Sequence, residues 1–203
     1  MATMNVLDSA ASVVAVEKPN ANGQATMANS RPVSIASDQS PVAVNSPGFV
    51  SSASTTRPND TTAYTALDVV DGASPANLTF SNVGAVAGGH IFITGASIRI
   101  DVAAVPSDMS SFRLHLFDAA PTAIADNAAF NLIAADRAKY LGFIEIGTPL
   151  DLGDTLFGRT DNLNFKTKLA AASTTLYGQL QTVGAFTPAA ETVKTITIHG
   201  IQS

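Results

Sequence analysis

The sequence contains no cysteine, and this absence excludes several kinds of chemistry at once. Disulfide bonds, thiolate catalysis, zinc fingers and iron–sulfur clusters all depend on cysteine side chains. Tryptophan is also absent, and aromatic residues make up only 6% of the 203 residues. We therefore expect apolar burial and backbone pairing alone to hold the fold together.

Charged residues are scarce as well, at 13% of the chain, where a typical globular domain has about 25%. The net charge is −5 and no run of Lys or Arg occurs, so the basic surface of a nucleic-acid-binding protein is missing. A surface built mainly from Ser, Thr, Asn, Ala and Gly can pack against neighbours at low desolvation cost. Composition thus favours a component of an assembly, with an ordinary secreted domain of neutral surface as the alternative.

Neither a signal peptide nor a membrane span is evident. The first charged residue is Asp8 rather than a basic residue, and Ser12 interrupts the apolar stretch 10–16. No apolar run reaches the roughly 18 residues of a membrane-spanning helix. We expect the protein to be made in a cytoplasm and to have no membrane partner.

The first 60 residues differ from the rest of the chain. They contain one aromatic residue and five prolines, too little apolar material to enclose a core. Short alternations of apolar and small residues follow Pro32 and Pro41, at positions where proline removes no interior strand donor. We predict that residues 1–60 form an extended N-terminal arm that adds strands to a partner, with a disordered tail as the alternative. The predicted partner-binding residues are Arg31, Val33, Ile35, Val42 and Val44.

From residue 61 onward the pattern is that of strands, and residues 89–101 are the clearest example. Ile91 and Ile93 share one face of such a strand, whereas Ile98 and Ile100 have the opposite parity. One extra residue at Gly95 or the next position would restore a single buried face, so we predict a β-bulge there. We expect Ile91 and Ile100 to share one core with Phe112, Leu114 and Leu116 of a neighbouring strand.

The remaining segments complete an all-β domain. Strands are expected at 78–80, 112–116, 141–146, 156–157, 163–168, 176–183 and 193–201, with the last two forming a hairpin. Between Asp126 and Tyr140 the spacing of Phe130 and Ile133 predicts one short helix. The predicted fold is therefore a β-sandwich or jelly roll of residues 61–203 with one short helix, preceded by the long extended arm.

The histidines and aspartates show no metal-binding pattern. His90, His115 and His199 fall in separate predicted strands, without the spacing that places two on one face. We interpret them as isolated histidines on a sheet surface. A second set lies close in sequence but lacks the spacing of a calcium loop, so we interpret its members as turn residues. This set consists of Asp151, Asp154 and Asp161.

Catalytic signatures are missing too. No Gly-x-Ser-x-Gly elbow occurs, and Gly88 and Gly89 lead into a strand rather than a phosphate-binding helix. The chain has only three glutamates, one of them in the arm, which is poor material for a paired-carboxylate glycosidase. We therefore predict a protein that is not an enzyme, with no catalytic residues, no metal and no cofactor.

Three segments carry a resemblance to a known group. Residues 29–44, NSRPVSIASDQSPVAV, resemble a segment of the form RPVxIASDQS that recurs in structural proteins of tailed bacteriophages. Residues 54–70 look like the start of a β-domain in phage particle proteins, with Leu67 where that group has glycine. Residues 126–130 and 139–143 are similar to the middle of the same group.

The resemblance implies a structural protein of the virion. A capsid decoration (cement) protein that stabilises the phage head is the first expectation, and a tail, baseplate or fibre component that contacts the host surface is the alternative. The implied partners are the phage major capsid protein or other virion proteins, and further copies of the chain in a homo-oligomer such as a trimer. The implied location is the virion, after synthesis in the host cytoplasm.

Overall fold

A computed structural model describes residues 6–7, 13–14 and 48–202. Strands β1 (Val6–Leu7) and β2 (Val13–Val14) form an antiparallel pair that belongs to the unit Met1–Ala43. All the other strands belong to the unit Val44–Ser203. This second unit is the domain described below.

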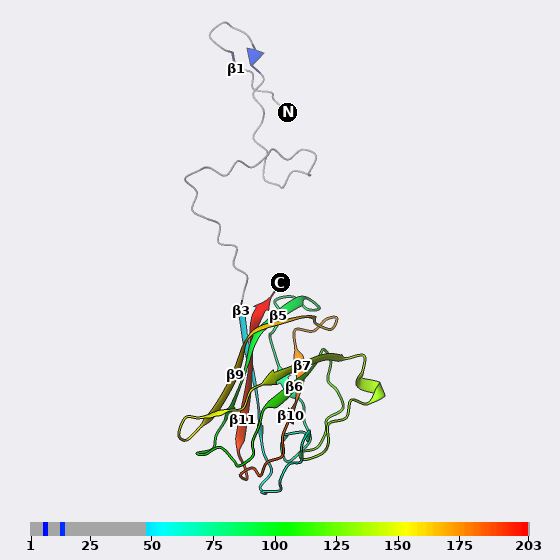
Figure 1. Ribbon diagram of the computed structural model, residues 1–203. Coiled ribbons are helices and arrows are strands. Elements are labelled where there is room, and N and C mark those ends of the chain that lie inside the picture. Colours follow the sequence, from blue (N-terminus) through cyan, green and yellow to red (C-terminus); the bar gives the residue numbers. More distant parts are fainter. Residues whose placement is uncertain (1–5, 8–12, 15–47, 203) are drawn as a thin grey trace. The chain divides into compact units, whose positions relative to one another are not determined.

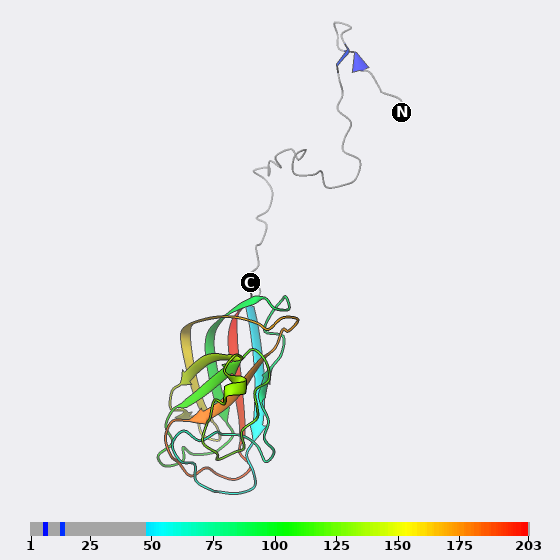
Figure 2. The same cartoon turned by 90° about the vertical axis from the view of Figure 1, so that its right-hand side faces the viewer.

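The domain is a sandwich of two antiparallel sheets, which Figures 1 and 2 show in two views. The five-stranded sheet has the order β3-β11-β5-β9-β8 and contains β3 (Gly48–Thr56), β5 (His90–Ile100), β8 (Leu150–Asp151), β9 (Leu156–Lys168) and β11 (Val193–Gln202). The four-stranded sheet has the order β4-β10-β6-β7 and contains β4 (Leu78–Phe80), β6 (Phe112–Phe117), β7 (Tyr140–Ile146) and β10 (Leu176–Thr182).

The pairing of the strands is that of a jelly roll. Leaving the short β8 aside, the first strand pairs with the last (β3 with β11), the second with the next to last (β4 with β10), and so on through β5 with β9 and β6 with β7. The folded-over ribbon of strand pairs closes when β11 also pairs with β5 and β10 with β6. The structure thus confirms the predicted all-β sandwich.

The predicted β-bulge in β5 is confirmed within one residue. The register of β5 against β9 shifts between Ile93 and Gly95, and the register against β11 shifts at the same level. Ile91 and Ile93 are therefore buried before the bulge, and Ile98 and Ile100 are buried after it. One strand can in this way keep a single face on the core over eleven residues.

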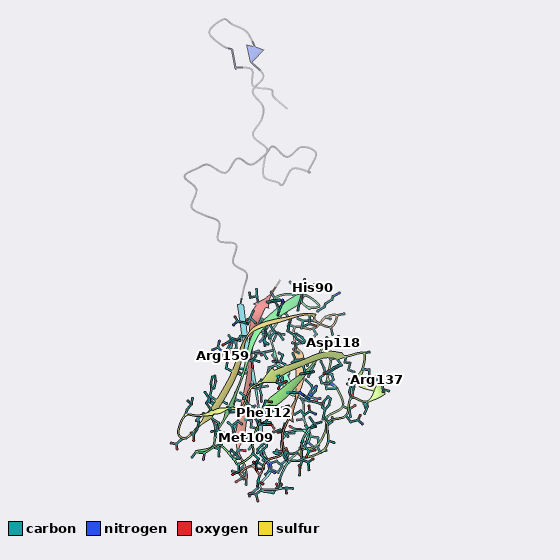
Figure 3. The ribbon with its side chains drawn as sticks, viewed as in Figure 1. His90, Met109, Phe112, Asp118, Arg137 and Arg159 are labelled. Carbon is teal, nitrogen blue, oxygen red and sulfur yellow. The ribbon has the colours of Figure 1, made fainter. Side chains whose placement is uncertain are left out.

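The core lies between the two sheets and contains the five residues predicted for it. Phe112, Leu114 and Leu116 of β6 are fully buried, and Ile91 and Ile100 of β5 pack in the same cluster. Figure 3 shows Phe112 among the side chains inside the domain.

The folded domain begins earlier than residue 61. Strand β3 lies within the range assigned to the arm, yet it pairs with β11 along all nine residues from Gly48 to Thr56. Its Phe49 ring packs over Gly200, where a Cβ atom would lie 2.5 Å from the ring. The Ser- and Thr-rich strand is thus an integral edge of the sheet, and only residues before it remain as the predicted arm.

The predicted helix between Asp126 and Tyr140 is wrong. In its place there is one 3-10 turn, Ala134–Asp136, and the preceding backbone pairs with another loop. The amide of Val69 donates to the carbonyl of Ala128 (2.8 Å), and the amide of Phe130 donates to the carbonyl of Leu67 (3.1 Å). These bonds use the groups that a helix would need for itself. Among the described residues no helix is long and apolar enough to cross a membrane.

Two details of strand pairing also differ from expectation. Strands β10 and β11 are consecutive but lie in different sheets, so they do not form a hairpin. Their connection crosses from one sheet to the other, as the jelly-roll topology requires. The segments 156–157 and 163–168 form one continuous strand, β9.

Candidate interaction surface

The residues predicted to bind a partner lie outside the described part of the chain. Arg31, Val33, Ile35, Val42 and Val44 all precede β3. Their role stays a prediction. The candidate sites in the described part of the chain lie within residues 48–202.

The outer face of the five-stranded sheet is rich in hydroxyl groups along β3 and β11. Alternate residues of these strands point away from the core and meet in cross-strand pairs. Ser52 and Thr197 lie 2.8 Å apart at their hydroxyl oxygens, and Ser54 and Thr195 lie 3.0 Å apart. Because these hydroxyls already bond to one another, covering them displaces few hydrogen bonds to water.

An exposed apolar patch adjoins this hydroxyl face. The side chain of Val50 on β3 is 69% exposed, and that of Ile201 on β11 is 41% exposed. Phe92 of β5 lies directly across from Ile201 on the same face and is half-buried. These three residues, which we call the Val50 patch, run across three adjacent strands at the end where β3 begins and β11 ends.

The exposed charged side chains of this sheet lie outside β3 and β11, and Arg99 of β5 is directly across from Thr195 of β11. Arg159 and Asp161 of β9 form an exposed ion pair of 2.7 Å, and Arg159 is labelled on that strand in Figure 3. Exposed pairs of this kind contribute little to stability. On the outer face the charges thus belong to β5 and β9, and β3 and β11 form the hydroxyl-rich part, which Arg99 borders.

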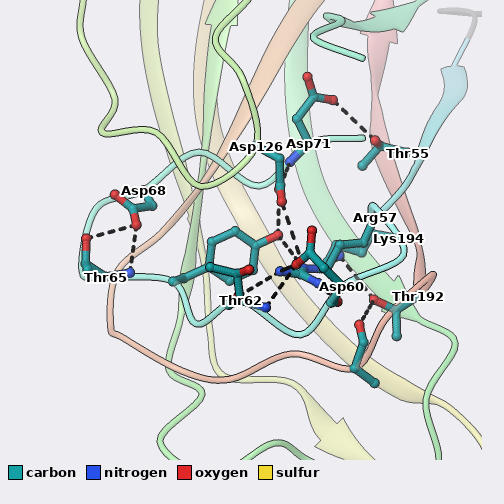
Figure 4. Close-up of polar contacts among 12 residues, drawn as sticks. Thr55, Arg57, Asp60, Thr62, Thr65, Asp68, Asp71, Asp126, Thr192 and Lys194 are labelled. Carbon is teal, nitrogen blue, oxygen red and sulfur yellow. Dashed lines mark hydrogen bonds and ion pairs between the residues drawn. The ribbon is translucent and has the colours of Figure 1, made fainter. Parts of the chain in front are cut away.

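A buried polar cluster occupies one end of the domain, where Arg57 follows β3 (Figure 4). The Arg57 side chain has no exposed surface. Its Nε donates to the hydroxyl oxygen of Tyr64 (3.2 Å), and its Nη2 donates to the carbonyl of Thr62 (2.7 Å). The guanidinium also pairs with the carboxylate of Asp60 at 2.8 Å and donates to the carbonyl of the same residue.

Tyr64 extends the cluster to a loop of the other sheet. Its hydroxyl donates to Oδ1 of Asp126 at 2.6 Å, and the amide of Asp71 donates to the same oxygen at 2.8 Å. Burial, together with this bond to a carboxylate, raises the pKa of Tyr64 far above its ordinary value of 10.0. Tyr64 therefore stays protonated and acts as a donor. The cluster ties the loop after β3 to the loop around Asp126 and serves the fold.

Lys194 is buried next to this cluster without an ion pair to any described carboxylate. It is 1% exposed, and its Nζ donates to the hydroxyl of Thr192 at 3.3 Å. Residues alternate between the two faces of β11, and Lys194 lies on the core-facing side with Ile196 and Ile198. Burial lowers the pKa of Lys194 from 10.5 to about 8. A buried ammonium of this kind is a cost to stability.

A shallow cavity of about 300 Å³ lies beside the cluster, lined by residues that include Asp60, Thr62 and Asp126. The carboxylates that reach it are already occupied. Asp60 accepts the amide of Thr62 at 2.9 Å, and this bond lowers the pKa of Asp60 below its ordinary value. Since these acceptors bond to the protein itself, the cavity offers no evident set of ligands.

His115 is buried rather than on the sheet surface as predicted. Its Nδ1 lies 3.0 Å from the hydroxyl of Tyr140, its Nε2 lies 3.1 Å from Oε1 of Gln181, and its ring stacks on Phe130 at 3.8 Å. Burial lowers the pKa of His115 below its ordinary value of 6.5. Both ring nitrogens are engaged in a neutral ring, so His115 is available neither as a base nor as a metal ligand.

The remaining candidates do not converge. His90 lies at the start of β5 (Figure 3), and His199 lies near the end of β11. Asp151 is the last residue of β8 and accepts the amide of Gly153 at 2.8 Å, Asp154 lies in the bend between β8 and β9, and Asp161 lies within β9 rather than in a turn. Within the ranges that the structure covers, no group of three or more acidic or histidine side chains is arranged to hold a metal ion.

Comparison with known proteins adds no family. No protein-family model matches the chain, and no curated protein matches it. Among solved structures, a chain from a heated full particle of Israeli acute paralysis virus gives a TM-score of 0.30 at 12% identity, covering 98% of this chain and 90% of that one. A chain from the native virion of Kashmir bee virus at acidic pH gives a TM-score of 0.32 at 14% identity, covering 94% and 85%. Likeness at this level carries no argument about function.

The sequence does not predict this interaction surface, because β3 lies within the range 1–60 that is predicted to form the arm. A signal was available for its partner strand. In β11 the alternation of Thr195, Thr197 and His199 with Ile196 and Ile198 marks one polar and one buried face. The buried Arg57 cluster, in contrast, joins residues up to 69 positions apart, as the Arg57–Asp126 pair shows. No local sequence pattern predicts contacts between residues so far apart.

Proposed function

We propose that the chain is a structural protein of a tailed-bacteriophage particle and, more specifically, a decoration protein of its capsid. The observation that carries the proposal is the uncharged, hydroxyl-rich outer face along β3 and β11, which suits a surface that is covered in an assembly. The resemblance of residues 29–44 to phage structural proteins supports the same role. Jelly rolls occur in viral capsid proteins but also in lectins and cupins, so the fold alone is only compatible with it.

The other jelly-roll roles find less support in the described residues. A cupin-like metal site needs converging histidines, and His115 is committed to Tyr140 and Gln181. A lectin stacks sugars on exposed aromatic rings. Among the described Phe and Tyr side chains, only that of Phe143 is largely exposed, at 47%. Docking of a protein partner on the hydroxyl-rich sheet face therefore fits the described side chains better than a cupin-like metal site or a lectin sugar site.

In this proposal the predicted arm supplies additional contacts. Val33, Ile35, Val42 and Val44 alternate with small residues and require an apolar partner surface, and Arg31 precedes them. Several weak contacts on one chain raise the total affinity without a single strong site. The partners are the major capsid protein or other virion proteins, and neighbouring copies of this chain.

A tail, baseplate or fibre location is the second candidate, and a separate observation favours it. Phe143 is 47% exposed, and the guanidinium of Arg113 lies 5.2 Å from the centre of its ring. This aromatic–cation pair on the outer face of the four-stranded sheet is suitable for contact with a host surface.

Quantitative mass spectrometry of purified particles separates these proposals. The measured quantity is the ratio of this chain to the major capsid protein. A decoration protein is expected at a ratio near that of the shell lattice, whereas a tail or baseplate component is expected at a far lower ratio. Absence of the chain from washed particles would contradict both virion roles.

A further inference from the structure

Strand β3 is an edge strand, and the loop at Asp71 and Gly72 lies beside only its last two residues, Thr55 and Thr56. Natural edge strands are kept from pairing by charges, prolines, bulges or shortness. Strand β3 has nine residues, GFVSSASTT, with no charge and no proline, and its register with β11 is continuous. Every second residue of such an edge turns its N–H and C=O groups away from the neighbouring strand.

The other sheet edges in the described part of the chain do show protection. Strand β4 has three residues and β8 has two, which are too short to serve as a template. Strand β7 carries the charged Glu145, and the β6–β7 register shifts between Leu116 and Phe117. Among these edge strands, only β3 is long, uncharged and regular enough to pair with a further strand.

Side chains beside this edge favour an apolar partner strand. Val50 is 69% exposed on β3, and the Val50 patch continues over Ile201 and Phe92. A strand added next to β3 that carries two β-branched residues on its outward face would extend this apolar row. A second β3 is a poorer match, since symmetric pairing about Ser52 places Val50 opposite Ser54.

We propose that β3 accepts residues 42–46 of a second copy of this chain as an added antiparallel strand. Val44 then lies beside Val50 and Val42 beside Ser52, on the outward face. The inference deepens the proposed function, because it names β3 of a neighbouring copy as one acceptor of the arm. It also supplies backbone partners on the side of β3 that pairs with no other described strand.

The sequence between the two segments disfavours the same pairing within one chain. Gly48 is already extended and paired with Ile201. Within one chain the proposed register would place Ser46 beside Gly48 and leave Pro47 alone as the turn, and the nearest register with a feasible loop, Val44 beside Gly48, uses residues 45–47 as that loop. A three-residue hairpin loop ordinarily ends in a residue with positive φ. Proline is locked near −65° and cannot take that place, and Pro47 occupies it. Exchange between copies avoids this turn.

The absence of cysteine makes the test direct, because every disulfide must come from introduced residues. One full-length chain carries Val42→Cys, and a second, size-tagged chain carries Ser52→Cys. The two are mixed and mildly oxidised. A disulfide between the two different chains is expected. As a matched control, Thr79→Cys places the thiol on an exposed hydroxyl position of the other sheet's edge strand, β4, and is expected to cross-link far less.

Three results would overturn the proposal. Equal cross-linking to positions 52 and 79, or none to either, would remove β3 as the acceptor. Dimers of the Ser52→Cys chain alone, forming as fast as the mixed species, would show that β3 pairs with itself. A disulfide within single chains that carry both Val42→Cys and Ser52→Cys, formed at high dilution, would show pairing in the same copy.

A second variant measures the strength of the contact. Val50→Lys adds a charge to the edge at a side chain that is 69% exposed, so thermal stability should stay unchanged. Self-association of the full-length protein, measured by analytical ultracentrifugation, is expected to weaken about tenfold, or about 1.4 kcal/mol. Unchanged association would contradict the proposal. If Val50→Lys does not weaken self-association but the protein is present in particles, the strand exchange is contradicted and the proposed function is not. If the cross-link forms but the protein is absent from particles, the proposed function is contradicted and the strand exchange is not.

Discussion

Replacing Lys194 by methionine should make the protein more stable at neutral pH. Lys194 lies on the core-facing side of β11, 1% exposed, and borders the same small cavity as the apolar side chains of Ile100, Val102 and Met109. Methionine has similar length and no charge, so it can fill this space with an apolar end. Thr192 loses a donor, but its own hydroxyl still donates to the carbonyl of Ala189 at 3.4 Å.

The size of the effect follows from the pKa. Burial lowers the pKa of Lys194 from 10.5 to about 8. Each pKa unit corresponds to about 1.4 kcal/mol between the two protonation states, so keeping the buried ammonium charged costs roughly 3 kcal/mol. Replacing buried ions by apolar residues is commonly neutral or stabilising by about 1–4 kcal/mol. We expect the Lys194→Met protein to gain about 1–3 kcal/mol in free energy of unfolding at pH 7.

The same reasoning gives the pH dependence. At pH 7 Lys194 is protonated in both the folded and the unfolded protein, so the full cost is present. As pH rises through about 8 the folded protein releases the proton, while the unfolded chain keeps it until about 10.5. The unfolded state then binds more protons, so the stability of the wild type rises with pH in this window. The advantage of the Lys194→Met protein should therefore shrink between pH 8 and 10.

Urea denaturation at pH 7, 8.5 and 9.5 measures both effects. Lys168→Met is the matched control, because Lys168 is exposed at the end of β9, and it should change stability little at any of these values. A Lys194→Met protein that is less stable than the wild type at pH 7 would refute the conclusion that the buried charge of Lys194 destabilises the fold. A gain that does not depend on pH would refute the pKa argument.

Three further outcomes follow from the fold. Leu114→Ala should destabilise the domain by about 2–5 kcal/mol in chemical denaturation, whereas Leu150→Ala, at a side chain that is 71% exposed, should cost under about 0.5 kcal/mol. Equal losses would mean that the faces of the strands are misassigned. Tyr64→Phe removes the donor to a buried carboxylate and should cost about 1–3 kcal/mol; a neutral change would show that the cluster does not stabilise the loops. Limited proteolysis should cut first before Gly48 and leave a fragment that retains β3, as intact mass will show, and a first cut at 57–61 would contradict the place of β3 in the sheet.

The sequence predicted those parts of the fold that depend on local alternation. The faces of β5 and β6 followed from the spacing of their Ile, Leu and Phe residues, and even the bulge followed from the parity change between Ile93 and Ile98. Strand β3 could not be found in this way. Its buried face consists of one Phe followed by Ser and Ala, so its place depends on Gly200 making room for Phe49.

The failed helix and hairpin show a second limit. The spacing of Phe130 and Ile133 is compatible with a helix, but Phe130 is used to stack on His115, and its amide bonds to Leu67. These partners, His115 and Leu67, lie 15 and 63 positions from Phe130, and they override its local preference. The choice of sheet for β11 depends likewise on the whole topology. The candidate surface shares this property, because it is assembled from the two ends of the domain sequence.

Binding to particles tests the central claim, that the chain is a virion component attached in part by its N-terminal arm. The measurement is co-sedimentation of purified full-length protein and of a variant lacking residues 1–45 with phage particles that lack the native protein. We predict that the full-length protein sediments with the particles and that the truncated protein, folded by circular dichroism, binds far more weakly. Failure of the full-length protein to bind would contradict the virion role, and undiminished binding of the truncated protein would assign attachment to the β-sandwich alone.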